Sequence, residues 1–332
     1  MRTAVQLLAI PLSVVVCLLG LEVESVGQTE ASPVTQSQQV RMSLIVTDRS
    51  KRPIQDLRAE EIQLTDDGQP RPITFFAKDE RPLRYTIALD TSGSLRRLLP
   101  TCISIASALI QNNRVNDETM IVRFVSSDKI EPVQDFTSDK SKLIDSLKLM
   151  RVEGGQTAVV DAVHLSVQAT ASRKGDNADV RRVLVLISDG EDRASYYSQD
   201  NLLQLLREKD VQIFALGVVG QLDNEGGMIR ATPRDRAEKL LNRLAEETGG
   251  QAFFADDLAE LVDAAKHVNT NLALQYIIGF ERHNQPGEKG FRKIKASIVR
   301  PSEKLIAIMR PSYWVGPIEP DSKKVKQTKD KK

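Results

Sequence analysis

Residues 85–94 read Tyr85-Thr86-Ile87-Ala88-Leu89-Asp90-Thr91-Ser92-Gly93-Ser94, and this stretch decides the fold. Its first part is a mostly apolar run, which is typical of a strand buried on both faces of a sheet. Its second part is small and polar. Apolar residues at helical spacing follow it, namely Leu95, Leu98, Leu99, Cys102, Ala106, Leu109 and Ile110. The stretch therefore predicts a buried strand, a polar loop and then a helix, which Pro100 should kink or split.

The same alternation of strand and helix recurs downstream. Further apolar runs of strand length lie at 120–125, 183–187 and 211–216. Stretches with apolar residues at helical spacing separate or follow these runs. They lie at 158–171, around Leu202–Leu206, and from Ala237 to Leu244, and the last of them ends before the pair Gly249-Gly250. Strands that alternate with helices are typical of a doubly wound sheet. The sequence therefore predicts an α/β domain with a mostly parallel sheet, spanning about residues 84–271.

The segments on either side of this domain read as β structure. In the N-terminal β region, 39–82, residues 40–47 alternate between apolar and polar. A hairpin is predicted there from residues 61–65 and 73–76, around the Asp-Gly turn at 66–69. The C-terminal segment, 272–316, returns to alternation. Because neither segment alone buries much core, we expect the two to pack together as a small β-sandwich-like region, with the α/β domain inserted in it.

The N-terminal end predicts export. Met1-Arg2-Thr3 carries one positive charge, an apolar run covers residues 4–21, and Ser25 and Gly27 stand where a signal peptidase would read small residues. This pattern indicates a signal peptide over 1–27, with a retained membrane anchor as the alternative. We expect the chain to be periplasmic, in the cell envelope or secreted. After cleavage Cys102 would be the only cysteine, so no internal disulfide is expected.

Composition narrows the classes of function. Of the 332 residues, 41% are hydrophobic and 27% charged, as in a globular protein with a real core. Aromatic residues make up 5%, and no glycine-rich phosphate loop opens the first helix, so neither nucleic-acid nor nucleotide binding is expected. Residues 28–38 read as a linker. The Lys-rich tail, 317–332, reads as disordered, and weak contact with an anionic surface is the alternative.

Three polar segments should meet at one edge of the sheet. They are Asp90–Ser94, then Gly154-Gly155-Gln156-Thr157, then Ser188-Asp189-Gly190-Glu191. In open α/β sheets, ligands bind at the carboxyl ends of the strands, where Asp90 and Asp189 are expected. Each segment alone is most simply a helix cap or a turn. Together they offer carboxylates and hydroxyls without His or Cys, which suits Mg²⁺, Mn²⁺ or Ca²⁺.

These three segments resemble the metal-ion-dependent adhesion site of von Willebrand factor A domains. The resemblance covers about residues 84–271, and the β flanks resemble a bacterial group of exported proteins related to these domains. It implies metal ligation by the hydroxyls of three residues and, directly or through water, by two carboxylates. It also implies that an Asp or Glu of a partner protein completes the coordination. The implied ligands are Asp90, Ser92, Ser94, Thr157 and Asp189.

The resulting expectation is an exported, metal-dependent protein-binding module of adhesion type, with no enzymatic activity and a partner that the sequence does not identify. The alternative is a metal-dependent hydrolase of phosphates or esters, for which Glu191 and Asp192 would be the candidate bases. A third interpretation is a structural role in an envelope assembly. The last helix, predicted over 258–268, is expected to link the metal site to the C-terminal strands as a two-state element.

Overall fold

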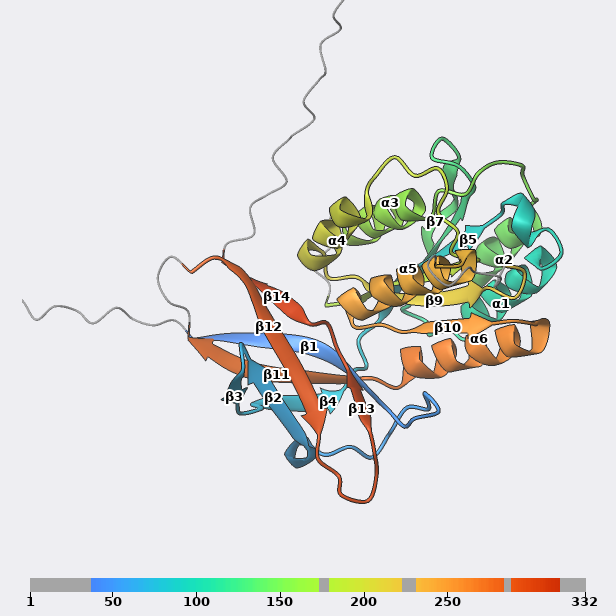
Figure 1. Cartoon of the computed structure of the whole chain (residues 1–332). Coiled ribbons are helices and arrows are strands. Elements are labelled where there is room, and N and C mark those ends of the chain that lie inside the picture. The colour runs from blue at the N-terminus through green and yellow to red at the C-terminus, as the bar shows by residue number, and fades with distance from the viewer. Residues whose placement is uncertain (1–36, 173–178, 223–230, 284–287, 317–332) are drawn as a thin grey trace, which may run out of the picture. The chain divides into compact units, whose positions relative to one another are not determined.

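The computed structural model describes residues 37–172, 179–222, 231–283 and 288–316 (Figure 1). The predicted signal peptide, 1–27, and the Lys-rich tail, 317–332, lie outside these residues. Most of the predicted linker does too, but its last two residues do not, because the first strand already begins at Ser37. In the described part of the chain, no helix is both long enough and apolar enough to cross a bilayer.

The α/β domain is built on a six-stranded sheet with the order β10-β9-β8-β5-β6-β7. Neighbouring strands are parallel except β7, which pairs with β6 in the antiparallel sense. This confirms the predicted doubly wound, mostly parallel sheet. The strands at its two edges, β7 and β10, were not predicted: β7 carries charged residues and Pro132, and β10 has only four residues. The strands are β5 (Leu83–Asp90), β6 (Glu118–Phe124), β7 (Ile130–Thr137), β8 (Arg181–Ser188), β9 (Gln212–Val218) and β10 (Ala252–Ala255).

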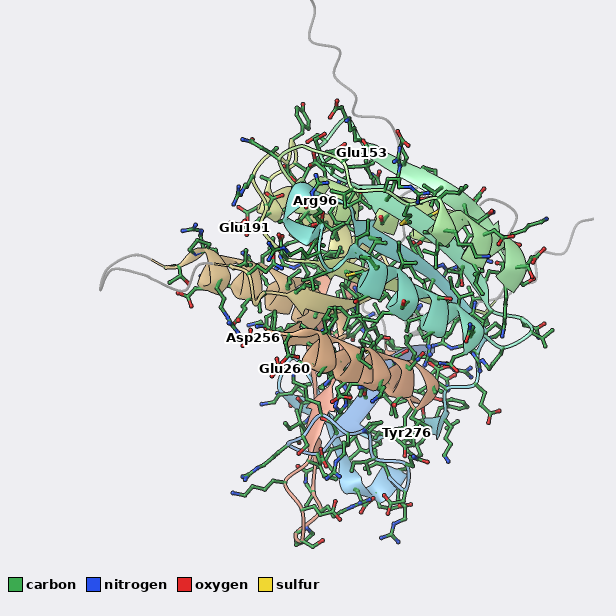
Figure 2. The ribbon with its side chains drawn as sticks, turned by 90° about the vertical axis from the view of Figure 1, so that its right-hand side faces the viewer. Arg96, Glu153, Glu191, Asp256, Glu260 and Tyr276 are labelled. Atoms are coloured by element: carbon green, nitrogen blue, oxygen red, sulfur yellow. The ribbon has the colours of Figure 1, made fainter. Side chains whose placement is uncertain are left out.

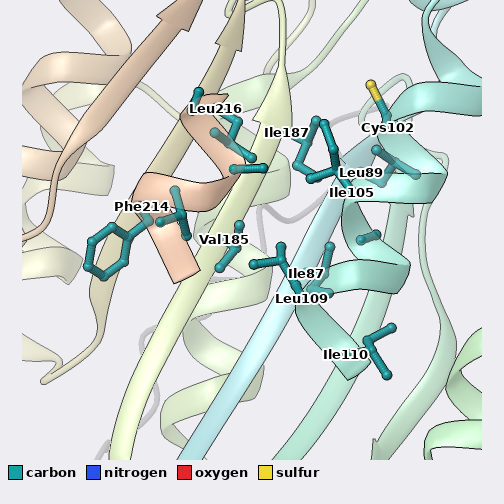
Figure 3. Close-up of a cluster of buried hydrophobic side chains, with 14 of the residues drawn as sticks. Ile87, Leu89, Cys102, Ile105, Leu109, Ile110, Val185, Ile187, Phe214 and Leu216 are labelled. Atoms are coloured by element: carbon teal, nitrogen blue, oxygen red, sulfur yellow. The ribbon is translucent and has the colours of Figure 1, made fainter. Parts of the chain in front are cut away.

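Helices cover both faces of this sheet (Figure 1). Alternate residues of the central strands enter two cores, so that Ile87 and Leu89 pack on one face and Ala88 on the other. Figure 3 shows the first of these cores, where residues of α1 such as Cys102 and Ile105 lie beside strands β5, β8 and β9. That face is covered by α1 (Leu99–Gln111), α2 (Lys140–Lys148) and α6 (Leu258–Ala273), and the other by α3 (Val159–Ala171), α4 (Gln199–Glu208) and α5 (Pro233–Thr248).

The first helix is interrupted as predicted, and the last helix differs from the prediction. Pro100 splits the first one: a short 3-10 turn, η2 (Gly93–Leu95), is followed by α1, whose first turn holds Pro100. A proline is tolerated there because its missing amide hydrogen would have no helical partner. The last helix, α6, runs five residues beyond the predicted end. Its expected apolar residues Leu258 and Val262 are 48% and 42% exposed, since the buried stripe follows Leu261, Ala265, Val268 and Leu272 instead.

The β region forms two four-stranded sheets that share a core. Their orders are β13-β1-β11-β4 and β14-β12-β2-β3. Strand β1 pairs with β11, and β2 pairs with β12, so each sheet joins strands that precede the α/β domain to strands that follow it. Leu44, Leu64 and Phe280 are among the residues of the shared core. The strands are β1 (Ser37–Thr47), β2 (Ile62–Asp66), β3 (Gln69–Arg71), β4 (Phe75–Lys78), β11 (Tyr276–His283), β12 (Gly290–Ile298), β13 (Ile306–Ile308) and β14 (Ser312–Val315), with one 3-10 turn, η1 (Ala59–Glu61).

The predicted hairpin has a different second strand. Asp67 and Gly68 both have positive φ, at 48° and 78°, which is the backbone of a two-residue hairpin turn. Such a tight turn starts the return strand at once, so β3 rather than residues 73–76 pairs with β2. Pro72 has no amide hydrogen to continue that pairing. The chain then crosses to the other sheet, where β4 pairs with β11.

Candidate metal centre

Asp90 ends the central strand β5 and is completely buried. Parallel pairing with β8 sets Leu89 opposite Ile187, so the next residues along, Asp90 and Ser188, are neighbours. The Ser188 hydroxyl donates to Asp90 Oδ2 over 2.7 Å, and the amide of Ser92 donates to Asp90 Oδ1 over 2.9 Å. The Asp90 carboxylate is therefore fixed in orientation by one hydrogen bond on each oxygen.

Two serine hydroxyls follow Asp90 in the polar loop. Ser92 is buried in the loop, and Ser94 lies in the 3-10 turn η2. Their Oγ atoms lie 2.9 Å apart, within hydrogen-bond distance. The Ser92 hydroxyl lowers the pKa of the Asp90 carboxyl, and the Ser94 hydroxyl lowers that of Asp189, in each case against the larger effect of burial. The two hydroxyls thus lie near the carboxyl group that ends β5 and the one that follows β8.

Backbone hydrogen bonds hold the Thr157 segment against the other two. The amide of Glu153 donates to the Thr91 carbonyl over 2.9 Å, which ties the start of this segment to the Asp90 loop. The Thr157 carbonyl accepts from the amides of Arg193 and Ala194, at 2.8 and 3.1 Å, which ties it to the loop after Asp189. Thr157 itself is buried. The structure therefore brings the three predicted segments together at the carboxyl edge of the sheet.

Asp189 follows β8 and has a buried carboxylate oxygen that lacks a hydrogen-bond partner among the described residues. Its Oδ1 accepts the amide of Glu191 at 3.0 Å, whereas its buried Oδ2 accepts no hydrogen bond from any residue that the structure describes. The next residue, Gly190, has φ +78°, and a Cβ there would approach Leu241 Cδ1 to 2.9 Å. Glycine lets the loop lie closely on α5 in a left-handed conformation. A buried acceptor without a donor is costly unless another group satisfies it.

The two carboxylates resist ionisation when no cation is present. Burial, followed by the negative charge of Asp189, raises the pKa of Asp90 to about 7, against the opposing hydrogen bonds of Ser92 and Ser188. Burial also raises the pKa of Asp189, which the Ser94 hydroxyl and the Glu191 amide partly offset. A divalent cation beside the two groups would favour their charged forms, because an opposite charge stabilises a carboxylate.

The donor set fits a hard divalent cation. It contains carboxylate and hydroxyl oxygens but no imidazole or thiolate, which is the chemistry of Mg²⁺, Mn²⁺ or Ca²⁺ sites. In the described ranges there is no group of three or more His, Cys, Asp or Glu side chains that could hold a metal by itself. The hydroxyls of Ser92, Ser94 and Thr157 would supply further oxygens to an ion beside the two carboxylates. Which of these oxygens would contact the ion stays a prediction.

The acidic side chains Glu153, Glu191 and Asp192 near the site are engaged with neighbours. Arg96, Glu153 and Glu191 lie at the same end of the α/β domain (Figure 2). Glu153 pairs with Arg123 and, over 3.2 Å, with Lys129. Glu191 pairs with Arg193. Asp192 Oδ1 accepts the Val160 amide at 3.1 Å and the Ser195 hydroxyl, and so caps α3. Beyond keeping loops soluble, these acids hold the loops in place.

Sequence reasoning missed the role of Ser188. It noted this residue only as part of a motif, yet the Ser188 hydroxyl donates to Asp90 and accepts the Gly190 amide at 3.0 Å. The signal was available in the pattern, because Ser188 is the polar residue that directly follows the apolar run 183–187. A polar residue in that place lies beside the last residue of the neighbouring parallel strand.

One of the comparisons with known proteins identifies the class of the α/β domain. A family model described as von Willebrand factor type A domain matches residues 86–267. In sequence, none of the curated proteins matches this chain. Among solved structures, the chain is similar to the conserved hypothetical protein BatB from Bacteroides thetaiotaomicron, with 18% identity over 57% of this chain and 98% of that one and a TM-score of 0.43.

Two further solved structures are similar to this chain. One is proximal thread matrix protein 1 from the mussel byssus, with a zinc-occupied MIDAS motif, at 16% identity, 64% coverage of this chain, 50% of that chain and a TM-score of 0.47. The other is a von Willebrand factor type A protein from Catenulispora acidiphila, at 9% identity, 84% and 72% coverage, and a TM-score of 0.45.

Proposed function

We propose a function from one premise: this chain belongs to the family of von Willebrand factor type A domains. Such domains generally mediate metal-dependent contacts between proteins. The proposal is that this chain is an exported binding module of adhesion type, in the periplasm, the envelope or the medium. It grips an acidic residue of a partner protein through a divalent cation. It catalyses no reaction. Export rests on the apolar run over 4–21 and the small residues that follow it.

The proposed ligands are Asp90, Ser92, Ser94, Thr157 and Asp189. When bound, the cation would supply an electrophilic centre that accepts an oxygen from an outside carboxylate. Three of the five donors are neutral hydroxyls, so two carboxylates only balance a divalent charge and leave the site attractive to a further anion. Mg²⁺ is the proposed ion, with Mn²⁺ and Ca²⁺ as alternatives of the same donor preference.

One observation carries this proposal: Oδ2 of Asp189 is buried, has no hydrogen-bond partner in the part of the chain that the structure describes, and lies near two serine hydroxyls and a second buried carboxylate. Capping alone would satisfy such an oxygen with a backbone amide, as happens at Oδ1. The hydrogen bonds that tie Thr91 to Glu153 and Thr157 to Arg193 hold the donors together without using their side chains. That arrangement supports a preformed site for a cation.

The state of the two candidate bases supports binding over hydrolysis. A general base must be free to take a proton from water. Glu191 is instead paired with Arg193, and Asp192 accepts hydrogen bonds from the Val160 amide and the Ser195 hydroxyl. Mg²⁺-dependent turnover of a generic phosphoester or carboxylic ester that disappears in Asp189→Asn would favour the hydrolase instead.

Affinity capture tests the proposal. The chain without residues 1–27 is immobilised and exposed to envelope extract in Mg²⁺, in Mg²⁺ followed by chelator, and in chelator alone. We expect a partner that is held in Mg²⁺ and released by chelator. Thr157→Ala should lose this partner, whereas Ser104→Ala, which removes an exposed hydroxyl on α1, should keep it. Replacing single Asp or Glu residues of the partner should abolish binding at one position.

Capture that is unchanged by chelator or by Thr157→Ala would overturn the proposal, because the partner would then be held by a surface that does not use the cation.

A further inference from the structure

A cavity of 370 Å³ lies at the opposite end of the parallel sheet from the candidate metal centre. Arg181 and Gln212, the first residues of β8 and β9, stand in its wall, beside residues 38–43 of β1. Its lining is strongly cationic. A single acidic residue, Asp210, faces six arginines, namely Arg41, Arg81, Arg181, Arg182, Arg282 and Arg310.

Three of these arginines have an acidic partner. Arg81 pairs with Asp79 at 2.8 Å, Arg310 pairs with Asp210 at 3.3 Å, and Arg282 pairs with Glu288. Arg41 differs, since its Nε donates to the neutral Oε1 of Gln39 at 2.7 Å and its guanidinium lies 4.3 Å from the ring centre of Phe75. These ion pairs neutralise part of the charge of the wall, and the net charge of the lining stays positive.

The positive charge that is not neutralised lies mainly on Arg181 and Arg182. Arg181 is 4% exposed, and its Nη2 donates to the Leu272 carbonyl. Its Nε and Nη1 are buried and have no hydrogen-bond partner among the described residues. Burial lowers the pKa of Arg181 to about 10, with the charge of Asp79 opposing, so the group stays protonated at neutral pH. An unpaired buried charge of this kind is strongly destabilising unless a counter-charge reaches it.

Arg182 extends the same wall. Successive residues of a strand point to opposite faces, so its side chain leaves β8 on the other side from that of Arg181. It is half-buried, and within the described part of the chain its side chain has no hydrogen bond or ion pair. The cavity is therefore bordered by two arginines with free donors in the described part of the chain, namely Nε and Nη1 of Arg181 and the guanidinium group of Arg182.

We propose that this cavity binds a small molecule or ion that carries an oxyanion, either phosphate or carboxylate, through Arg181, Arg182 and Arg41. A guanidinium group presents paired donors that match the oxygens of both anions. A cavity of 370 Å³ is at the small end of the range for small-molecule sites, about 300–1,000 Å³. The site is separate from the metal centre, because the eight residues of β8 set Arg181 and Ser188 roughly 23 Å apart.

Isothermal titration of the metal-free full chain tests this proposal, with inorganic phosphate, pyrophosphate and citrate as probes at constant ionic strength. We expect saturable binding of one probe molecule per chain. Tighter binding of pyrophosphate would identify a phosphate-bearing ligand, and tighter binding of citrate a carboxylate. Arg182→Gln should weaken binding by about tenfold or more, the loss expected for one charge-assisted hydrogen bond. Arg243→Gln, an exposed arginine on α5, is the matched control and should bind as the parent does.

The variants are chosen so that folding does not decide the outcome. Arg182 is half-buried and leaves the backbone pairing of β8 intact, and unchanged circular dichroism would confirm the fold. Asp90→Asn should keep full affinity for the preferred probe, which separates this site from the metal centre. The proposal is overturned if none of the three probes binds saturably, or if Arg243→Gln weakens binding as much as Arg182→Gln.

Discussion

Asp90→Asn should make the metal-free protein more stable at neutral and alkaline pH. The folded chain encloses this carboxyl group completely and raises its pKa to about 7 from an ordinary 3.8. A folded-state pKa above the unfolded value means that the folded chain holds a proton which the unfolded chain releases. Stability is therefore highest below pH 4 for this group, and it falls as the pH rises from about 4 to 7.

The size of the effect follows from that pKa. At 1.36 kcal/mol per pH unit, a group that titrates at about 7 instead of 3.8 lowers the free energy of unfolding by about 4 kcal/mol once it is ionised. Asparagine has no charge to bury and can still accept the Ser92 amide on Oδ1. Its amide nitrogen replaces Oδ2, however, so the Ser188 hydroxyl loses its acceptor at a cost of about 1 kcal/mol. The net gain at pH 8 should be about 3 kcal/mol.

Urea denaturation in chelator at pH 5 and pH 8 measures this directly. The parent chain should lose stability relative to Asp90→Asn as the pH rises, and excess Mg²⁺ should restore the parent but not the variant, since only a site that binds metal is stabilised by it. Glu246→Gln removes an exposed carboxylate on α5 and should follow the parent at both pH values. The reasoning is refuted if Asp90→Asn is less stable than the parent at pH 8 in chelator, or if the difference between the two does not change with pH.

Three further substitutions have expected outcomes. Thr157→Ala should reduce the Mg²⁺ affinity measured by calorimetry at least about tenfold. It should change the free energy of unfolding by less than about 1 kcal/mol, because the Thr157 carbonyl keeps its two amide partners. Unaltered affinity would remove Thr157 from the ligand set. Asp66→Asn should cost about 1.5–3 kcal/mol in urea, since the buried Asp66 carboxylate accepts hydrogen bonds from Arg292 and Tyr313, and a neutral amide weakens these charge-assisted bonds. Burial alone would raise the pKa of Asp66, but the hydrogen bonds of Arg292 and Tyr313 hold it below its ordinary value. The parent should therefore lose the stability that ionised Asp66 contributes as the pH falls through that lowered pKa. Equal acid sensitivity of parent and variant would contradict this. Gly249→Ala should lower the thermal midpoint by the equivalent of about 1–3 kcal/mol. Residue 249 has φ +73°, and a Cβ there would lie 2.4 Å from the Arg310 amide nitrogen. A midpoint at or above that of the parent would show that the chain can relax there.

The α/β fold could be predicted because its central strands are buried on both faces. Such strands leave continuous apolar runs in the sequence, and β5 buries all eight of its residues. The edge strand β7 escaped notice because none of its residues is fully buried and it includes charged residues. The same reasoning explains α6: its apolar residues occupy more than one face, and only the contacts of the folded chain show that Leu261 and Leu272 are inside while Leu258 is outside.

The polar segments of the candidate site could be predicted from their positions at strand ends, since parallel strands bring their carboxyl ends to one edge. Their mutual hydrogen bonds could not. The bond from Ser188 to Asp90 depends on the register between β8 and β5, which no local pattern encodes. The second strand of the N-terminal hairpin was misplaced for a similar reason, because both candidates follow the same Asp67-Gly68 turn and only pairing with β2 or β11 distinguishes them.

Crystals grown with Mn²⁺ and measured at its absorption edge would locate the cation by its anomalous scattering. The expected map has one strong peak within coordination distance of Asp189 Oδ2 and of the hydroxyls of Ser92, Ser94 and Thr157. A map with no peak there at saturating Mn²⁺, or with its only peak at another place in the chain, would contradict the proposed metal-dependent binding.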